Sequence, residues 1–348
     1  MTAIQRHPLY SEDLDRILET GFAQALAGRR VAVTGASGLI GTVLVDALLR
    51  ANRLGAGIAV TAIARDRDRL AERFGDRTAD PMLRILAHDV REPLPEDLSF
   101  DVGIAAASNT SPLDYAAHPV ATARTNLDGA RHMLDAAARR GGRVLFCSSV
   151  EVYGNARGDE SFSEDDTGLL QIGNARASYP ESKRAAEALC QCYRAEFGVP
   201  VNAARICRVF GPTVLPGDTK AASQFIANAA RGEDIVLKSE GTQFYSWIHV
   251  ADCVSALLAI LARGEDGLAY NVAADGCDAS LRDFAQCAAD AAGTKLVFDL
   301  PNEAERRGYS KTTRAVLDAS RLRALGWNPA YGLAEAVART VAIQKESA

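Results

Sequence analysis

The chain has 348 residues, of which 48% are hydrophobic and 24% charged, a composition typical of globular proteins and unlike that of disordered or collagen-like chains. Its length is roughly twice the 150 residues expected of one domain, which allows one large domain or two closely packed ones. Lysine and arginine number 39 against 44 acidic residues, giving a net charge of −5, and no basic block marks a nucleic-acid partner.

Residues 1–30 show neither the apolar core of a signal peptide nor a membrane span, because charged residues interrupt the apolar ones throughout. Ser11 followed by Leu14, Ile17 and Leu18 predicts a capped helix over 11–27 that packs on the main body. The seven cysteines are an odd number without a Cys-x-x-Cys pair, which indicates buried thiols rather than disulfides or a metal site. We expect a cytoplasmic protein without a membrane anchor.

From residue 31, short β-type runs alternate with longer helical patterns. The expected strands are 31–34, 58–64, 83–87, 102–107, 143–148 and 201–207, and the expected helices are 39–50, 121–139 and 182–197. Several of these strands are apolar at nearly every residue, as happens when helices cover both faces of a parallel sheet. After residue 212 the alternation fades, and only helices at 221–231 and 251–262 and a strand at 270–272 are indicated.

This pattern predicts an α/β fold with a doubly wound parallel sheet of Rossmann type and a smaller, interleaved C-terminal α/β lobe for the substrate. We expect residues 1–30 to be a helical extension and residues 31–212 to be the dinucleotide-binding domain. Residues 213–348 are then mainly the substrate-binding lobe, with returns to the sheet.

A glycine-rich turn connects the first strand to the first helix of this sheet, Thr34-Gly-Ala-Ser-Gly-Leu-Ile-Gly41. Glycines at this spacing permit a tight turn and a close approach of the backbone to a pyrophosphate, and the helix N-terminus supplies N–H groups. Because a strand precedes and a helix follows, the turn predicts a dinucleotide site rather than a ligand-free loop. The residues expected at the cofactor are Gly35, Ser37, Gly38, Leu39, Ile40 and Gly41.

The end of the second strand usually selects between NAD and NADP through an acid that binds the ribose 2′-hydroxyl. Arg65 and Asp66 follow that strand here. Arg65 could meet the 2′-phosphate of NADP, could stack on adenine while Asp66 binds the ribose, or could lie in solvent within a charged loop. The residues alone leave the choice between NAD and NADP open.

A proton-transfer pair is predicted at the start of the helix that follows residue 178. Tyr179 and Lys183 are four residues apart, so they lie on one face of that helix, and Pro180 suits its first turn. A nearby ammonium favours the phenolate and lowers the pKa of Tyr179 from about 10 toward that of a general base. The fifth strand adds serine hydroxyls, Ser149 among them, at its carboxyl end, where open α/β sheets bind ligands.

Taken together, these motifs resemble those of the extended short-chain dehydrogenase/reductase superfamily, in its NAD-dependent nucleotide-sugar epimerase/dehydratase branch. The similarity covers about residues 30–275, and it is weaker around Arg314 and 325–329. The matching segments are 34–41, 88–90, 105–108, 126–129, 148–154, 179–183 and 205–212.

The resemblance implies a nucleotide-diphosphate sugar as substrate, NAD as cofactor and a homodimer formed through a helix bundle. It implies that Tyr179 and Lys183 lie on the nicotinamide ribose, and that Ser149 binds the sugar hydroxyl whose proton Tyr179 removes, which yields a 4-keto sugar. The further residues that it places at the cofactor are Asp89, Val90, Ala105, Ala106, Ala107 and Asn126. Those that it places at the substrate are Ser108, Ser149, Arg208 and Arg314.

The residues after Ser149 bear on the reaction that follows. The 4,6-dehydratases of the family carry Asp-Glu there and the related decarboxylases carry Ser-Glu, whereas this chain has Val150 and Glu151. Valine cannot donate a proton, but Glu151 keeps proton transfer beside the ketone possible. A plain epimerase needs only Ser149, Tyr179 and Lys183.

We therefore predict an epimerase that works through a 4-keto sugar with bound NAD. A decarboxylase or 4,6-dehydratase acting through the same intermediate is one alternative, an NADPH-dependent 4-ketoreductase is another, and a non-catalytic cofactor sensor is a third. Two substitutions relative to many relatives concern the substrate: Arg208 replaces an Asn, and Tyr245 replaces an Arg. Arg208 could bind a diphosphate or a sugar carboxylate through its forked guanidinium.

Overall fold

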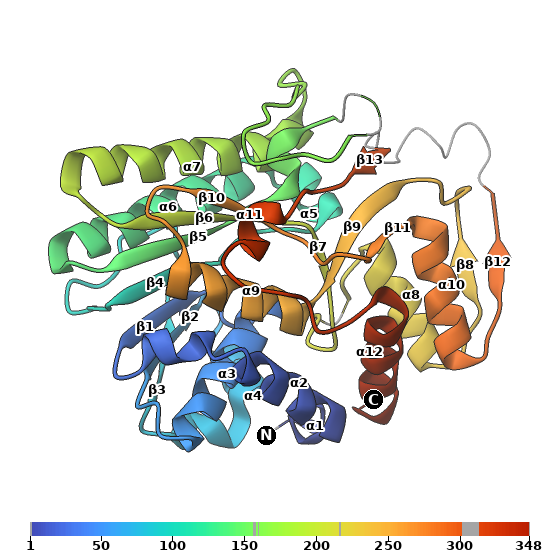
Figure 1. Ribbon diagram of the computed structural model, residues 1–348, viewed down its shortest axis with the longest axis horizontal. Coiled ribbons are helices and arrows are strands. Elements are labelled where there is room, and N and C mark those ends of the chain that lie inside the picture. Colours follow the sequence, from blue (N-terminus) through green and yellow to red (C-terminus); the bar gives the residue numbers. More distant parts are fainter. Residues whose placement is uncertain (1, 156–157, 159, 216, 301–312, 348) are drawn as a thin grey trace.

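Seven parallel strands form the central sheet of the computed structural model, in the order β10-β6-β5-β4-β1-β2-β3 (Figure 1). The structure describes residues 2–155, 158, 160–215, 217–300 and 313–347. The strands are β1 Arg30–Thr34, β2 Ala59–Ala64, β3 Leu83–Ala87, β4 Val102–Ala105, β5 Arg143–Ser149, β6 Val201–Ile206 and β10 Ala269–Val272. The strand order reverses between β1 and β4, and such a switch point is where open α/β sheets bind ligands.

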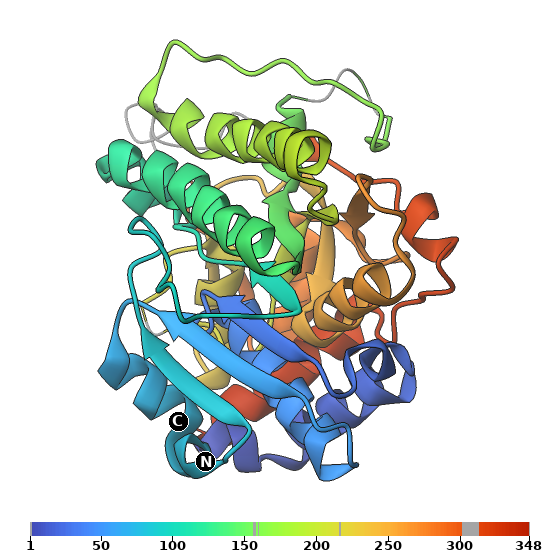
Figure 2. The same ribbon diagram turned by 90° about the vertical axis from the view of Figure 1, so that its left-hand side faces the viewer.

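Helices cover both faces of the sheet, because alternate strand residues are apolar on both sides. Val31 and Val33 pack into a core shared with α3 and α9, whereas Ala32 faces the core under α6 and α7. Figure 2 shows α6 and α7 side by side along one face. The elements around the sheet are α3 Leu39–Arg53, α4 Arg67–Phe74, η2 Gly75–Ala79, α5 Pro112–Ala117, α6 Pro119–Arg140, η3 Val150–Tyr153, η4 Ala175–Ala177, α7 Ser178–Phe197 and α9 Val250–Arg263.

The predicted parallel sheet and its crossover helices are confirmed, with small differences at their ends. The fourth strand ends at Ala105 rather than at 107, because the N–H groups of Ala106 and Ala107 donate to the Thr34 hydroxyl instead of to a neighbouring strand. Helix α7 begins at Ser178, four residues before the predicted start, which brings Tyr179 into its first turn.

The single helix predicted over 11–27 is wrong. Helix α2 spans Pro8–Glu19 and is capped by His7, whose ring accepts from the N–H of Leu9. It stops before Gly21, which has a φ of +75°, and a short 3₁₀ helix, η1 Phe22–Leu26, follows. The apolar spacing resembles one continuous helix, but the glycine takes the left-handed conformation that ends it.

The smaller lobe contains short strands that the sequence pattern misses. Its sheet is built on β9, which pairs with β7, β11 and β13, and a second sheet pairs β8 with β12. The elements are β7 Arg208–Phe210, α8 Ala221–Ala230, β8 Ile235–Leu237, β9 Phe244–His249, β11 Asp278–Ser280, α10 Leu281–Ala292, β12 Leu296–Phe298, β13 Arg314–Ala315, α11 Ser320–Arg323 and α12 Leu333–Ser347. All of these strands except the six-residue β9 are two or three residues long, which is too short to show a two-residue period.

The N-terminal helices, α1 Ala3–Arg6 and α2, connect the sheet domain to the C-terminal helix α12 (Figure 1). Buried Asp46 of α3 accepts from the Tyr10 hydroxyl at 2.6 Å and pairs with Arg77 at 2.5 Å. Buried Asp13 of α2 accepts from Arg339 of α12 at 2.8 Å and from the Tyr331 hydroxyl at 2.6 Å. Across the described part of the chain, none of the helices is both long and apolar enough for a membrane span.

We expect Asp46→Ala to lower the free energy of unfolding by about 3–5 kcal/mol, because it leaves the buried Arg77 guanidinium without its carboxylate. The matched control is Asp15→Ala, which removes the partly exposed Arg50–Asp15 pair between α3 and α2 and is expected to cost at most about 1 kcal/mol. Urea denaturation measures both variants. Equal losses would show that the buried carboxylate does not hold the extension in place.

Candidate active site

The glycine turn between β1 and α3 is closed tightly against the end of β4. Gly35 has a φ of +70°, and a Cβ atom there would lie 2.7 Å from the Ala106 carbonyl oxygen. A Cβ on Gly41 would lie 2.3 Å from the Gly35 carbonyl oxygen. Gly38 caps α3 without a side-chain hydrogen bond, so the first turn presents its N–H groups to a ligand. This cradle fits the pyrophosphate of a dinucleotide.

Thr34 ties this turn to the segment that follows β4. Its buried hydroxyl accepts from the N–H groups of Ala106 and Ala107, both at 3.2 Å. The segment 105–107 and the turn 35–41 therefore lie against each other, as expected for two parts of one cofactor site. Ser37 and Gly41 are buried at this junction, and Leu39 and Ile40 are half-buried.

Several charged side chains lie at the position expected for adenine. Asp89 accepts from the Arg91 guanidinium through both carboxylate oxygens, and these bonds lower its pKa to about 2. Arg65 is exposed, and its charge also acts on Asp89. Asp66 caps α4 by accepting from the N–H of Arg69. Val90 is buried against Gly129 of α6.

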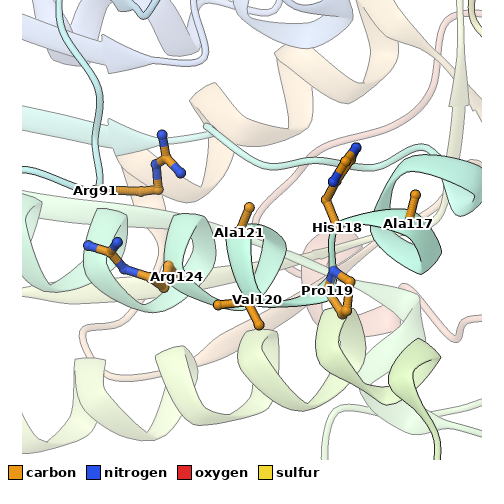
Figure 3. A pocket seen from close by; sticks show the side chains of 7 residues that line it. All are labelled: Arg91, Ala117, His118, Pro119, Val120, Ala121 and Arg124. Carbon is orange, nitrogen blue, oxygen red and sulfur yellow. The ribbon is translucent and has the colours of Figure 1, made fainter.

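A pocket of about 380 Å³ opens next to Asp89 at the start of α6. Figure 3 shows Arg91 and Arg124 of α6 near each other at one end of the lining residues, with His118 and Ala117 at the other end. Both arginines are paired within the chain, Arg91 with Asp89 and Arg124 with Asp128. The predicted catalytic residues do not line this pocket, so it borders the predicted adenine position rather than the chemistry.

Tyr179, Ser149 and Ser108 come together at the carboxyl ends of β4 and β5. Tyr179 is buried, and burial raises the pKa of its phenol, while hydrogen bonds with Ser149 and Ser108 lower it. Its ring stacks on Tyr115 of α5, with the ring centroids 5.3 Å apart and the planes at 19°. Sequence reasoning missed Tyr115, which carries no motif that would single it out. The Arg176 guanidinium lies over the Tyr115 ring, with its carbon 5.9 Å from the ring centre.

Lys183 is almost fully buried one turn beyond Tyr179. Its Nζ donates to the Cys147 carbonyl oxygen at 2.7 Å and lies 5.9 Å from the centre of the Tyr179 ring. Burial lowers the pKa of this ammonium to about 8. The predicted pairing of the two side chains on one helix face is therefore present, with the lysine anchored to β5.

Asn126 supports this arrangement from α6. It accepts from the Ser108 hydroxyl at 2.7 Å and donates to the Ser182 hydroxyl at 2.8 Å. Ser182 in turn donates to the Tyr179 carbonyl oxygen at 3.0 Å. The Asn126 amide thus bridges a predicted substrate residue and the helix that carries Tyr179. Its predicted contact with the cofactor stays a prediction.

Glu151 lies directly beside Ser149 and faces Arg208. The Glu151 N–H donates to the Ser149 hydroxyl at 3.2 Å, and Arg208 Nη2 lies 3.6 Å from Glu151 Oε1. The Arg208 guanidinium is stacked on Tyr245, 3.4 Å from the ring centre. The two substitutions that the sequence singles out, at 208 and 245, therefore contact each other.

Arg314 lies on the opposite face of β9 from Arg208. Its guanidinium lies over Phe244, 5.0 Å from the ring centre, whereas Arg208 lies over Tyr245. Successive residues of a strand point to opposite faces, so the two arginines lie on opposite faces of β9. The structure does not bring Arg314 to Tyr179 and Ser149, and its predicted substrate contact stays a prediction.

A partly buried polar network lies behind Ser149, the predicted catalytic serine. The Ser148 hydroxyl donates to Glu187, which also binds the Arg205 guanidinium at 2.8 Å. Arg205 continues to the Tyr153 hydroxyl at 2.9 Å. Sequence reasoning missed Glu187, although it lies four residues after Lys183 on the same helix face, a spacing that could have indicated it.

We expect Gly35→Ala to weaken NAD binding by at least about tenfold, because the added methyl group meets the Ala106 carbonyl and pushes the turn away from the pyrophosphate. Gly28→Ala is the matched control, since Gly28 has the same φ of +70° but nothing within 4 Å of its Cβ position. Fluorescence titration with NAD and thermal unfolding measure both variants. Similar NAD affinities for the two variants would contradict the predicted phosphate site.

The lowered pKa of Lys183 predicts a pH dependence of stability in the cofactor-free protein. Between about pH 8 and about pH 10.4 the unfolded chain holds a proton on this lysine that the folded chain has lost, so the free energy of unfolding rises with pH. We expect Lys183→Met to remove this rise, which is on the order of 3 kcal/mol. Urea denaturation across this range measures it, and parallel curves for both proteins would contradict the prediction.

The chain is similar to known proteins over most of its length. Residues 31–273 match the model of the NAD-dependent epimerase/dehydratase family. UDP-glucuronic acid decarboxylase 6 of Arabidopsis thaliana is 33% identical over 68% of this chain and 67% of its own length. UDP-glucuronic acid decarboxylase 5 of the same plant is 30% identical over 88% of this chain and 86% of its own length.

Among solved structures, a dTDP-glucose 4,6-dehydratase from Streptomyces venezuelae with NAD bound superimposes with a TM-score of 0.77. It is 26% identical and covers 91% of this chain and 97% of its own. These findings confirm the expected fold, family, enzymatic nature and NAD cofactor, whereas the homodimer and the cytoplasmic location stay predictions. The chain belongs to the NAD-dependent epimerase/dehydratase family.

Proposed function

We propose that the protein is a nucleotide-sugar decarboxylase, which removes the carboxylate of a UDP-linked uronic acid through a 4-keto intermediate. The observation that carries this proposal is the position of Glu151 and Arg208 beside Ser149, which adds a proton-transferring group and a cation to the oxidation site. The similarity to UDP-glucuronic acid decarboxylases supports it. It replaces the epimerase expected from the motifs, because an epimerase requires neither group.

The cofactor site and the oxidation site adjoin at the carboxyl ends of β1, β4 and β5. The turn 35–41 and the segment 105–107 would hold the dinucleotide, with Lys183 near its nicotinamide ribose. When bound, NAD supplies a hydride acceptor for the sugar carbinol and returns the hydride later in the turnover. Asp89 would lie near the adenine end.

Tyr179 takes the proton of the C4 hydroxyl. Ser149 orients that hydroxyl, because its own hydroxyl meets Tyr179 and lies at the end of β5. Burial alone raises the pKa of Tyr179, so a phenolate requires nearby positive charge. Lys183 supplies one such charge, and its anchor on Cys147 keeps the ammonium in place.

The ketone at C4 explains why oxidation is followed by decarboxylation. The carboxylate on C5 is then in the β position to the ketone. The C5–C6 bond breaks, carbon dioxide leaves, and the electron pair moves toward the C4 oxygen to form an enolate. C5 then gains a proton, and Glu151 is the titratable side chain adjacent to Ser149 that can deliver it.

The 4,6-dehydratase alternative lacks support at Val150. This side chain is buried and carries no proton donor at the position where the dehydratases have an acid. The ketoreductase alternative relies on Arg65 binding a 2′-phosphate. Arg65 is exposed beside Asp89, a carboxylate that repels a phosphate.

The test is incubation of the NAD-loaded protein with UDP-glucuronate, followed by measurement of carbon dioxide and by NMR of the sugar product in deuterated water. We expect carbon dioxide release, with deuterium at C5 of a UDP-pentose. Glu151→Gln should lower kcat roughly 10²- to 10⁴-fold and keep NAD affinity. Tyr179→Phe should stop turnover.

Glu181→Gln is the matched control, since Glu181 is exposed to the same degree as Glu151, 37% against 36%, and also pairs loosely with an arginine. It should leave the rate unchanged. A six-carbon uronic acid inverted at C4, with no carbon dioxide released, would restore the epimerase and overturn the proposal.

A further inference from the structure

We infer that Arg208 is the residue that recognises the carboxylate of the sugar and so restricts the substrate to uronic acids. This inference rests on the proposed function, because it concerns the same site. The Arg208 guanidinium is stacked on the Tyr245 ring and forms a weak ion pair with Glu151.

The plane of the Arg208 guanidinium is fixed by Tyr245. The two side chains come from neighbouring strands, since Arg208 of β7 is in register with Trp247 of β9, two residues beyond Tyr245. Tyr245 is buried, and the guanidinium carbon lies 3.4 Å from its ring centre. A stacked guanidinium is preorganised, so it loses little conformational freedom when it binds a planar anion.

Arg208 forms a hydrogen bond with the Tyr245 side chain but still has an unused donor. Its Nη2 is 3.6 Å from Glu151 Oε1, which is too long for a hydrogen bond, and its Nη1 is enclosed without a hydrogen-bond partner among the described residues. Arg205, also half-buried, donates instead to Glu187, to Tyr153 and to a backbone carbonyl. A carboxylate would satisfy the fork of Arg208 with two parallel hydrogen bonds.

The position of Arg208 matches the C6 carboxylate better than the diphosphate. Glu151 adjoins Ser149, and Ser149 meets the Tyr179 hydroxyl, so Arg208 lies at the end of the site where C4 reacts. In a pyranose, C1 with its diphosphate is opposite C4, whereas C5 with its carboxylate is adjacent to C4. A cation beside Glu151 is therefore near C6 when the C4 hydroxyl is on Ser149.

This binding has a consequence for Glu151. In the protein alone, Glu151 is the acidic partner of Arg208. A substrate carboxylate on Arg208 replaces it and brings a second negative charge close to Glu151. Glu151, no longer paired with Arg208, is then the side chain that can deliver a proton to C5. Recognition of the substrate and preparation of the proton donor are thus linked through one arginine.

The test is calorimetric binding of UDP-glucuronate, UDP-glucose and UDP to the NAD-loaded protein, all in a Tyr179→Phe background that stops turnover. We expect tighter binding of UDP-glucuronate than of UDP-glucose. Arg208→Gln should weaken UDP-glucuronate about ten- to a hundredfold and change UDP-glucose and UDP less than about threefold. Arg208→Lys, which keeps the charge but not the fork, should fall in between.

Three controls accompany these variants. Arg184→Gln removes an arginine in a similar loose pair, 3.4 Å from Glu181, and should change nothing. Tyr245→Phe should keep the selectivity for UDP-glucuronate and Tyr245→Leu should reduce it, because only the first keeps the ring. NAD affinity reports whether each variant is folded.

Equal weakening of UDP-glucuronate and UDP by Arg208→Gln would assign Arg208 to the diphosphate and overturn the inference. An unchanged preference for UDP-glucuronate would overturn it as well, as would a wild-type site without such a preference. Failure of the proposed function has a different signature, because a site that binds UDP-glucuronate through Arg208 but releases no carbon dioxide would keep the recognition and reject the decarboxylation.

Discussion

The catalytic arrangement depends on the bond from the Lys183 ammonium to the Cys147 carbonyl oxygen. A buried ammonium is costly unless it has a partner, and this bond of 2.7 Å provides one at the residue directly before the two serines that end β5. It fastens the first turns of α7 to the carboxyl end of β5. Tyr179, one turn earlier on α7, is thereby held at the Ser149 hydroxyl. This one hydrogen bond therefore fixes the position of α7 relative to the end of β5.

Two arginines near this point show opposite uses of one side-chain type. Arg205 is saturated by Glu187, Tyr153 and a backbone carbonyl, so it holds β6, α7 and η3 together. Arg208, only three residues later, has a stacked plane and an unfilled donor. A guanidinium whose donors are bonded within the protein has a structural role, whereas one with unbonded donors is available for a ligand.

The N-terminal extension adds a third constraint, distant from the chemistry. Two buried carboxylate contacts of α2 reach different parts of the chain: Tyr10 donates to Asp46 of the sheet domain, and Asp13 accepts from Arg339 and Tyr331 near the C-terminus. The extension therefore restrains the two parts of the chain relative to each other. Because both contacts are buried, they are hard to exchange for water, which favours a fixed arrangement of the sheet domain and the C-terminal helix α12.

The parallel sheet, the glycine turn and the pairing of Tyr179 with Lys183 all follow from the sequence alone. These features are local: strand hydrophobicity, a turn flanked by a strand and a helix, and a spacing of four residues each have a short-range physical cause. The error in the helix predicted over 11–27 also has a local cause, because Gly21 ends the helix in spite of the apolar spacing.

Which distant residues share the site depends on how the strands and helices pack together. The contact of Arg208 with Tyr245 arises from the pairing of β7 with β9, and Tyr115 reaches Tyr179 from another helix. Likewise, the separation of Arg314 from Arg208 follows from the alternation of side chains on β9. Such contacts depend on strand register and helix packing across long separations in the chain, and no local spacing encodes them.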